Sequence, residues 1–465
     1  MESVSQDQQS FKFITGNPSQ KRNRNRQREI KSHVGREIAS RRRNAQPRLQ
    51  SWLLINRGDE SMPQQLRTEL VSSTPIPPRV GSEFSWVQFP EAMKPYMLQD
   101  LTKFFTLVID MLYPSSLCLP RHMLDSNIVG YLLSDPAFLH GALFCTESVF
   151  SQVMDAPSIP RKAFHMQRTL QLLQLRIAQS DEQPALSDAT LLTVSNMALQ
   201  AQFDNDWEVA LNHMQGLYRI VDLRGGFSAL EDCDHGVIEK ICRVDLSHSL
   251  HFSCPPKFFT ESMLWDSYIH KKPAGQANDT FDILRFLPSL DSKLVNAWND
   301  LRHFSNQSNV ATQTDSAFTR RVYSEIMLSV LYRLLNLSFE TGTANEALRT
   351  GMLTFATSLY FQWQSLNNGR DQFGERLNAE LCALKSGPGV VPVPLVFWLL
   401  MIWKTTVSET AAEREHVDYL DNIMRLMCIG YWENARDFLR RMIWIDRLCS
   451  TRGRGIIENA RARLS

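Results

Sequence analysis

The chain has 465 residues, of which 43% are hydrophobic and 21% are charged, and its formal net charge is +1. This composition is typical of a globular protein with a large core and argues against a wholly disordered or fibrous chain. The longest apolar run, Val390–Trp403, contains Pro392 and Pro394 and is too short to span a bilayer. The first ten residues are polar and lack the apolar region of a signal peptide. We therefore expect a soluble intracellular protein with no membrane partner.

The small net charge hides an uneven distribution of charged residues along the chain. Residues 1–50 hold twelve of the 50 Lys and Arg residues and four of the 49 Asp and Glu residues, which leaves 38 basic and 45 acidic residues for the remainder. A basic arm on a mildly acidic body indicates an anionic partner for the arm. The residues predicted to serve nuclear import or phosphate contact are Lys21, Arg22, Arg24, Arg26, Arg28, Lys31, Arg36, Arg41, Arg42 and Arg43.

Three interpretations of this arm remain open. It is a signal for an import receptor, an import signal that also contacts DNA, or a solvated tail. Each basic side chain placed on a phosphate releases a counterion, so contact with DNA would be salt-sensitive and poorly sequence-specific. We expect residues 1–50 to be disordered, although Ile30, Val34 and Ile38 are spaced for a helix that forms on binding.

A Pro- and Ser-rich linker at 51–84 is predicted to separate the arm from an all-helical domain at 85–465. Apolar residues at helical spacing predict helices before and after a central segment. Their expected ranges are 96–113, 137–154, 160–178, 237–250, 321–339, 346–363, 395–408, 414–428 and 432–449. Residues 259–315 show a mixed pattern, and no alternating stretch is long enough to suggest a sheet. The predicted fold class is all-α, a multi-helix bundle of antiparallel helix pairs.

The central segment, Ser187–Leu230, reads as two helices joined by a short polar turn. Asn205 with Glu208 three residues later has the spacing of a capping box at the start of the second helix. Gly225 and Gly226 can take the left-handed conformation that ends a helix. Six apolar residues are predicted to share one face of this helix: Trp207, Leu211, Met214, Leu217, Tyr218 and Val221.

The second helix and its glycine stop resemble the central signature of the fungal-specific transcription-factor domain, the all-helical regulatory region of many zinc-cluster regulators. The residues that carry this resemblance are Trp207, His213, Gly216, Leu217, Leu223, Arg224, Gly225, Gly226 and Leu230. Residues further along are similar to the family's continuation, namely Asp245, His248, Pro255, Pro256 and Phe258. The resemblance implies a structural role for these residues at the centre of a regulatory domain.

The arm is in turn similar to the N-termini of family members that lack the zinc cluster. This second resemblance rests on Phe11, Phe13, Arg28, Ile30, Ser32, His33, Val34, Arg36 and Arg41–Arg43. The zinc cluster needs six cysteines in two closely spaced groups, whereas the eight cysteines of this chain form no CxxC pair. Recruitment through a partner regulator is therefore an alternative to direct, sequence-specific DNA binding.

The two resemblances together imply a nuclear transcriptional regulator that works with DNA, an import receptor and the transcription machinery. Regulators of this kind control metabolic or secondary-metabolite gene clusters. The alternative is a nuclear adaptor that does not contact DNA. A third class, an enzyme such as a terpenoid-type synthase, needs an aspartate-rich metal-binding helix, and the acidic clusters at 204–206 and 231–234 lack that pattern. Because no GxSxG, GxGxxG, GxxxxGK[ST] or HExxH motif occurs, we expect no enzyme, no catalytic residue, no cofactor and no metal site.

A helical domain of this size has room for an apolar pocket, and the family resemblance leaves room for an effector in it without locating the site. Residues that could line one are Phe104, Phe144, Phe164, Met214, Trp398 and Trp403. Ordinary core packing is the alternative interpretation of the same residues.

Overall fold

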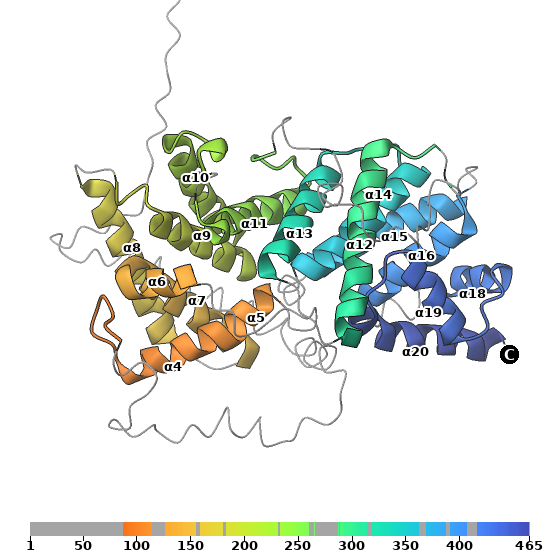
Figure 1. The fold of residues 1–465 in the computed structure, drawn as a ribbon, viewed down its shortest axis with the longest axis horizontal. Helices are drawn as coiled ribbons and strands as arrows, with labels where there is room; N and C mark the ends of the chain where they lie inside the picture. The colour runs from red at the N-terminus through yellow and green to blue at the C-terminus, as the bar shows by residue number, and fades with distance from the viewer. Residues whose placement is uncertain are drawn as a thin grey trace, which may run out of the picture. The chain divides into compact units, whose positions relative to one another are not determined.

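The computed structural model describes residues 87–113, 126–154, 159–179, 183–230, 233–259, 265, 287, 289–314, 319–361, 369–386, 391–406 and 416–464. All of these residues belong to one unit, 55–465. Every regular element within the described ranges is helical, and none is a strand (Figure 1). The predicted all-α fold is confirmed for this part of the chain. The predicted arm and linker lie outside the described residues.

The first group of helices runs from α4 to α11. Their bounds are α4 Pro95–Lys103, the π-helix η1 Phe104–Val108, α5 Ile109–Leu112, α6 Ser126–Ser134, α7 Pro136–Met154, α8 Ile159–Ala178, α9 Asp188–Phe203, α10 Trp207–Leu223, the 3-10 helix η3 Phe227–Leu230 and α11 His235–Phe252. Every residue of α9 from Ala189 to Phe203 is buried, because α7, α10 and α11 all pack against it. A helix covered on all sides has no polar face, so α9 lacks an amphipathic stripe.

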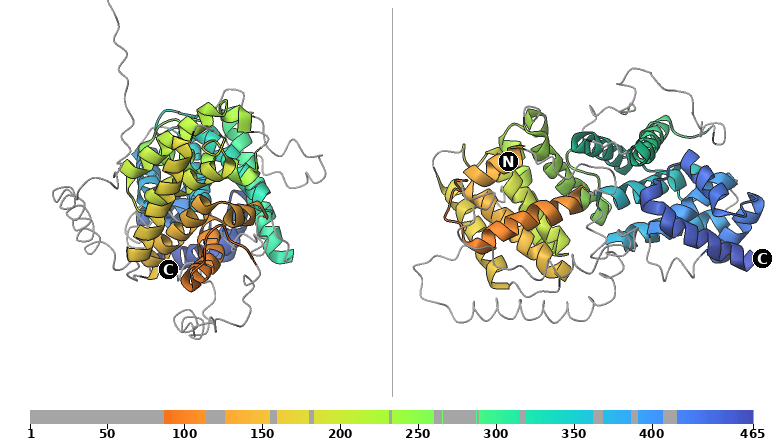
Figure 2. Two further views of the ribbon diagram at one scale, coloured as in Figure 1. Left: turned by 90° about the vertical axis from the view of Figure 1, so that its left-hand side faces the viewer. Right: turned by 60° about the horizontal axis from the view of Figure 1, so that its bottom comes forward.

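The second group of helices runs from α12 to α20. Their bounds are α12 Ser292–Thr314, α13 Arg320–Leu335, α14 Ala344–Tyr360, α15 Gly369–Ser386, α16 Val393–Thr406, α18 Val417–Leu426, α19 Trp432–Arg441 and α20 Asp446–Leu464. α16 is buried from Leu395 to Lys404 and packs against α14, α15, α18 and α20. The helices of this group are coloured from teal to dark blue in Figure 2. The apolar run that was too short for a membrane span is thus the central helix of this group.

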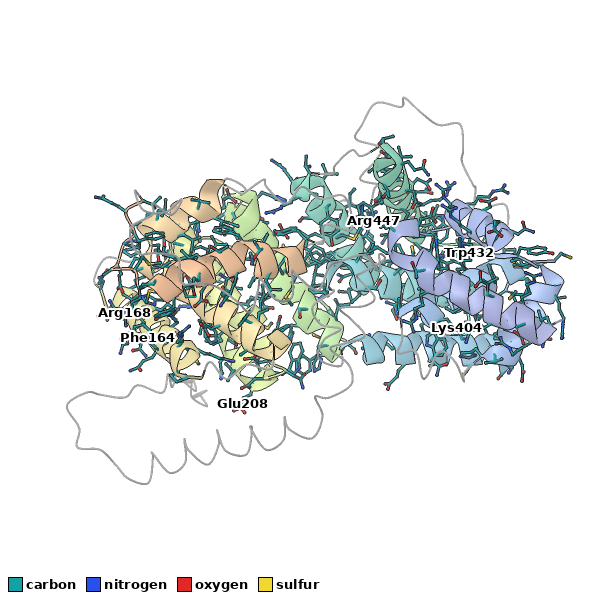
Figure 3. The ribbon with its side chains drawn as sticks, turned by 90° about the horizontal axis from the view of Figure 1, so that it is seen from below. Phe164, Arg168, Glu208, Lys404, Trp432 and Arg447 are labelled. Carbon is teal, nitrogen blue, oxygen red and sulfur yellow. The ribbon has the colours of Figure 1, made fainter. Side chains whose placement is uncertain are left out.

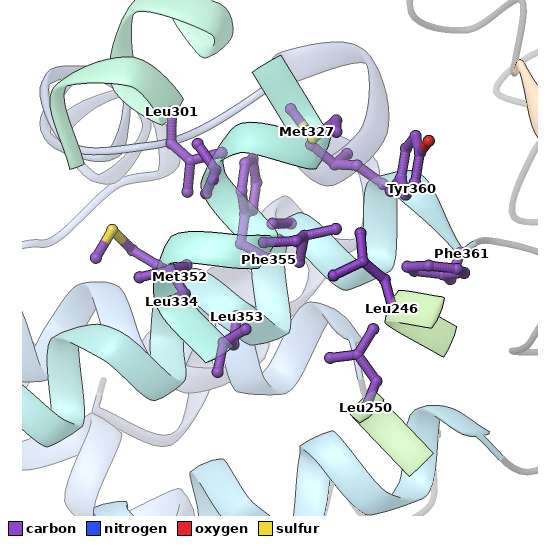
Figure 4. Packing of buried hydrophobic residues seen from close by; sticks show 14 of the residues in the cluster. Leu246, Leu250, Leu301, Met327, Leu334, Met352, Leu353, Phe355, Tyr360 and Phe361 are labelled. Carbon is purple, nitrogen blue, oxygen red and sulfur yellow. The ribbon is translucent and has the colours of Figure 1, made fainter. Parts of the chain in front are cut away.

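The two groups meet where α11 packs against α13. Leu246 and Leu250 of α11 belong to the same hydrophobic cluster as Met327, Tyr360 and Phe361 of the second group (Figure 4). Burial of each such side chain contributes about 1.5–3 kcal/mol, so the contact is a continuous core rather than a loose interface.

A buried ion pair reinforces this junction. Arg243 Nη2 lies 2.8 Å from Glu239 Oε1, and both side chains are at most 3% exposed. Arg243 Nη1 also donates a hydrogen bond to the Tyr360 carbonyl at 2.6 Å, while the Tyr113 hydroxyl donates to the Glu239 carboxylate. Removing one partner would leave an unpaired buried charge, which is strongly destabilising.

The prediction missed several helices, namely α6, α12, α15 and α20. A single helix was predicted at 432–449, and this was wrong, because α19 ends at Arg441 and α20 starts at Asp446. The break between α19 and α20 is stabilised by a residue that is distant in sequence. Asn309 of α12 donates its side-chain amide to the Trp444 carbonyl and accepts from the Asp446 backbone N–H, each at 2.8 Å. No local pattern could indicate that contact.

Candidate functional site

The ten basic residues predicted for import and phosphate contact all lie outside the described residues. They are Lys21, Arg22, Arg24, Arg26, Arg28, Lys31, Arg36, Arg41, Arg42 and Arg43. Their role therefore stays a prediction. The described part of the candidate site is the α9–α10 hairpin with the contacts that it makes.

The start of α10 differs from the prediction by one residue. The cap is Asp206, whose carboxylate accepts a hydrogen bond from the Val209 backbone N–H at 3.2 Å. Asn205 instead takes a left-handed conformation with φ of 59°, and its side-chain oxygen accepts from Trp207 Nε1 at 2.8 Å. Asparagine tolerates this conformation better than most residues, which lets it turn the chain between the two helices. The predicted capping box from Asn205 to Glu208 was wrong.

The predicted buried face of α10 is largely correct. Met214, Leu217 and Val221 are buried together with Ala210, and Tyr218 is half-buried. Leu211 was wrongly assigned to this face, since it is 39% exposed. At about 100° of rotation per residue, Leu211 lies roughly a quarter turn from the stripe that faces α9.

The predicted glycine stop at the end of α10 is confirmed. The Gly226 N–H donates to the Val221 carbonyl at 3.0 Å, and the Gly225 N–H donates to the Asp222 carbonyl at 3.1 Å. This pair of bonds defines the Schellman motif. The φ angles are +102° at Gly225 and +90° at Gly226, which a side chain would disfavour.

Arg224, which the resemblance placed in the signature, fastens the end of α10 to the start of α9. Its Nη1 lies 2.6 Å from Asp188 Oδ1, and its Nη2 donates to Cys233 Sγ at 3.0 Å. The Tyr131 hydroxyl of α6 donates to the other oxygen of Asp188 at 3.4 Å. Arg224 thus joins the two ends of the hairpin to each other, and Asp188 extends the contact to α6.

The remaining signature residues have varied environments. Trp207 stacks on the His251 ring, with the ring centroids 3.7 Å apart. Burial of the His213 ring lowers its pKa to about 4. Leu223 is 53% exposed. A Cβ atom added at Gly216 would meet no atom within 4 Å. Packing within the described residues therefore does not require glycine at this position.

Asp245, the acidic residue of the family-like continuation, is the centre of a hydrogen-bond cluster. Its Oδ1 accepts from the Tyr218 hydroxyl at 2.8 Å and from the Lys257 backbone N–H at 3.0 Å. Its Oδ2 accepts from the Tyr332 hydroxyl at 2.9 Å and from the Phe258 backbone N–H at 3.0 Å. The carboxylate is 1% exposed. It joins α10, α11, α13 and the segment after the two prolines, which gives this sequence pattern a structural role.

A pocket of about 50 Å³ lies between η1, α5, α7, α9 and α11. Its wall is mainly apolar, and its polar lining residues include Asn196, Gln200 and Lys240. Lys240 is 8% exposed, and burial lowers its pKa to about 8. Its Nζ donates to Asn196 Oδ1 at 3.2 Å. A lysine inside the apolar pattern of 237–250 was the signal that could have identified this site.

The residues proposed from sequence to line a pocket are mostly elsewhere. Phe104 does line it, but Trp398 and Trp403 are core residues whose ring N–H groups donate to the Ile443 and Gly374 carbonyls, each at 2.9 Å. The other three residues are placed as follows: Met214 is fully buried against α9, Phe144 is 5% exposed in a small separate cluster, and Phe164 is 44% exposed on α8 (Figure 3). For Met214, Trp398 and Trp403 the alternative interpretation, ordinary core packing, is therefore the correct one.

A second polar cluster joins α7 and α8 to the segment before α4. His140 Nδ1 lies 2.7 Å from His165 Nδ1, and His140 Nε2 lies 3.0 Å from Glu91 Oε2. The Tyr96 hydroxyl lies 3.2 Å from His165 Nε2, and Arg168 pairs with Glu91. Burial lowers the pKa of His165 to about 4, so this ring is neutral near neutral pH.

In the part of the chain that the structure describes, no group of three or more His, Cys, Asp or Glu side chains is placed to hold a metal ion. Within the same residues no single helix is long and apolar enough to cross a membrane. One pair, Ile128–Ser134 with Pro136–Gln152, reaches that length and composition together but is bent by 113°.

No family model, curated protein or solved structure matches this chain. The resemblance to the fungal-specific transcription-factor domain therefore stays a prediction from the residues quoted above, as does the expectation that the protein is not an enzyme.

Proposed function

We propose that the protein is a nuclear transcriptional regulator of the fungal-specific transcription-factor type. The observation that carries the proposal is the pairing, in one chain, of ten basic residues within Lys21–Arg43 and the LRGG-containing segment that ends α10. A basic arm supplies affinity for phosphates and for an import receptor, whereas an all-helical domain supplies surfaces for regulation. The partners are DNA, an import receptor and the transcription machinery, and the place of action is the nucleus.

The geometry of the α9–α10 hairpin agrees with the structural role that the resemblance implies. Arg224 binds Asp188, and the two glycines close the helix by a Schellman motif. These contacts support a regulatory domain organised around the hairpin. The target is proposed to be a metabolic or secondary-metabolite gene cluster, on the resemblance alone.

A nuclear adaptor without DNA contact is the second candidate. The observation that favours it is the lack of any CxxC pair among the eight cysteines, because sequence-specific binding in the wider family depends on a zinc cluster. In that case the basic arm would serve only for import, and a partner would select the promoters.

The salt dependence of DNA binding separates the two candidates. The full-length protein would be compared with a variant that carries Arg41→Ala, Arg42→Ala and Arg43→Ala. If the arm contacts phosphates, the slope of log affinity against log salt decreases by about 2–3 in the variant. A matched control with the same change in net charge replaces three exposed arginines of the domain, Arg219, Arg447 and Arg454, with alanine (Arg447 is labelled in Figure 3).

If the regulator contacts DNA through its arm, the slope of log affinity against log salt decreases in the first variant and stays unchanged in the control. Equal slopes in all three proteins would contradict arm-mediated DNA contact and favour the adaptor.

A further inference from the structure

The pocket beside Lys240 combines an apolar wall with one buried cation. Apolar side chains from η1, α5, α7 and α9 form the wall, among them Phe104, Val108, Val149 and Leu199. Lys240 lies on α11 at the polar part of this lining, next to Asn196 of α9. An apolar pocket with a few polar groups is the usual form of a small-molecule site.

Lys240 has no carboxylate partner among the described side chains. Its one hydrogen bond goes to the neutral carboxamide of Asn196. Glu239, the acidic residue directly before it in the chain, is paired with Arg243. An ammonium group that is 8% exposed without an anionic partner is costly, and buried charges in proteins are normally paired. The electrostatics of the pocket therefore favour an anion.

The backbone beside the pocket is also unusual. Phe104–Val108 forms a π-helix between α4 and α5, and the Ile109 N–H donates to the Phe104 carbonyl five residues back. Both terminal residues of this segment, Phe104 and Val108, line the pocket. π-helical turns inside α-helices are rare and occur frequently at functional sites.

We propose that this pocket binds a short-chain monocarboxylate, with the carboxylate on Lys240 Nζ and the alkyl chain against the apolar wall. The size follows from the volume of about 50 Å³. A cavity of roughly 150 Å³ holds the six carbons of benzene, so the alkyl part here is limited to about two carbons. The Asn196 carboxamide accepts a hydrogen bond from Lys240 and holds the ammonium group toward α9. The site does not depend on the proposed function in transcription.

The test uses the full-length protein with propionate as the probe and 1-propanol as a neutral probe of similar chain length. Binding is followed by isothermal titration calorimetry and by saturation-transfer NMR. Lys240→Met removes the charge at similar volume, and Lys293→Met on α12 is the matched control. We expect propionate to bind one site, at least tenfold more tightly than 1-propanol. Lys240→Met should weaken propionate binding at least tenfold, while Lys293→Met leaves the affinity unchanged.

Val149→Phe gives a second, independent measurement, because it fills the apolar wall without touching the charge. It should weaken propionate binding at least tenfold, and it decides the question if Lys240→Met does not fold. Three results would overturn the proposal: no binding of propionate to the wild-type protein at tens of millimolar, equal binding of propionate and 1-propanol, or unchanged propionate affinity in the folded variants.

Discussion

Replacing Asp245 with asparagine perturbs the buried carboxylate that accepts four hydrogen bonds, two on each oxygen. Each oxygen receives one tyrosine hydroxyl and one backbone N–H. Asparagine keeps the shape but turns one oxygen into an NH₂ group. A tyrosine hydroxyl beside that group can rotate and accept from it, whereas a backbone N–H cannot.

The expected cost follows from this asymmetry. Whichever way the introduced side-chain amide is turned, one of the Lys257 and Phe258 backbone N–H groups loses its acceptor. A buried donor without a partner costs about 1–3 kcal/mol, and the remaining bonds lose the strengthening that a charged acceptor provides. We therefore expect Asp245→Asn to lower the free energy of unfolding by about 2–4 kcal/mol.

The assay is chemical unfolding followed by far-ultraviolet circular dichroism. Asp222→Asn is the matched control, because the Asp222 side chain is 53% exposed and lies 3.5 Å from Lys257 Nζ in a solvent-exposed ion pair. The control should change stability by no more than about 0.5 kcal/mol. If Asp245→Asn were no more destabilising than Asp222→Asn, the reasoning that this cluster holds α10, α11 and α13 together would be refuted.

Three further predictions concern single residues. Gly225→Ala should destabilise the protein by about 1–2 kcal/mol, because φ is +102° at this position. Gly216→Ala should instead stabilise it by about 0.5–1 kcal/mol, because an added Cβ meets no atom within 4 Å and alanine favours the helix. Thermal unfolding measures both changes. His165, with its pKa lowered by burial from 6.5 to about 4, binds a proton more readily in the unfolded chain, so stability should fall by about 3 kcal/mol as pH drops from 6.5 to 4. His165→Asn should flatten that slope, and an unchanged slope would contradict the assignment. Lys240→Met should stabilise the protein by up to about 3 kcal/mol below pH 8, where the buried lysine is charged. Because burial lowers the lysine pKa from 10.5 to about 8, this gain should shrink between pH 8 and 10.5. A gain that does not change with pH would exclude the charge as its cause.

Local signals in the sequence were sufficient to predict the helices that have clear stops. The first predicted helix, 96–113, corresponds to the continuous helical segment that ends with α5 at Leu112, and the glycine pair ends α10 as predicted. The all-α class followed from helical spacing and the lack of strand patterns. The buried face of α10 could also be predicted from the sequence, because Met214, Leu217 and Val221 recur at helical spacing.

Features that depend on distant contacts could not be predicted. The break between α19 and α20 depends on Asn309, which is 135 residues from Trp444 in sequence. The cap of α10 is Asp206 rather than Asn205, because Asn205 has a left-handed backbone conformation. Both residue types are good helix caps, so the sequence alone does not decide between them. The location of the pocket could not be predicted, because its walls come from η1, α5, α7, α9 and α11, and only tertiary packing brings Lys240 beside Asn196.

The central claim, that the chain is a DNA-associated transcriptional regulator, is tested most directly by genome-wide crosslinking of the full-length protein in its own cells. A second protein would carry Arg41→Ala, Arg42→Ala and Arg43→Ala together with a strong foreign import signal, which separates nuclear import from DNA contact. We predict that the intact protein occupies discrete promoters and that the altered protein loses them. Equal occupancy by both would assign promoter choice to a partner, and no occupancy by the intact protein would contradict a role in transcription.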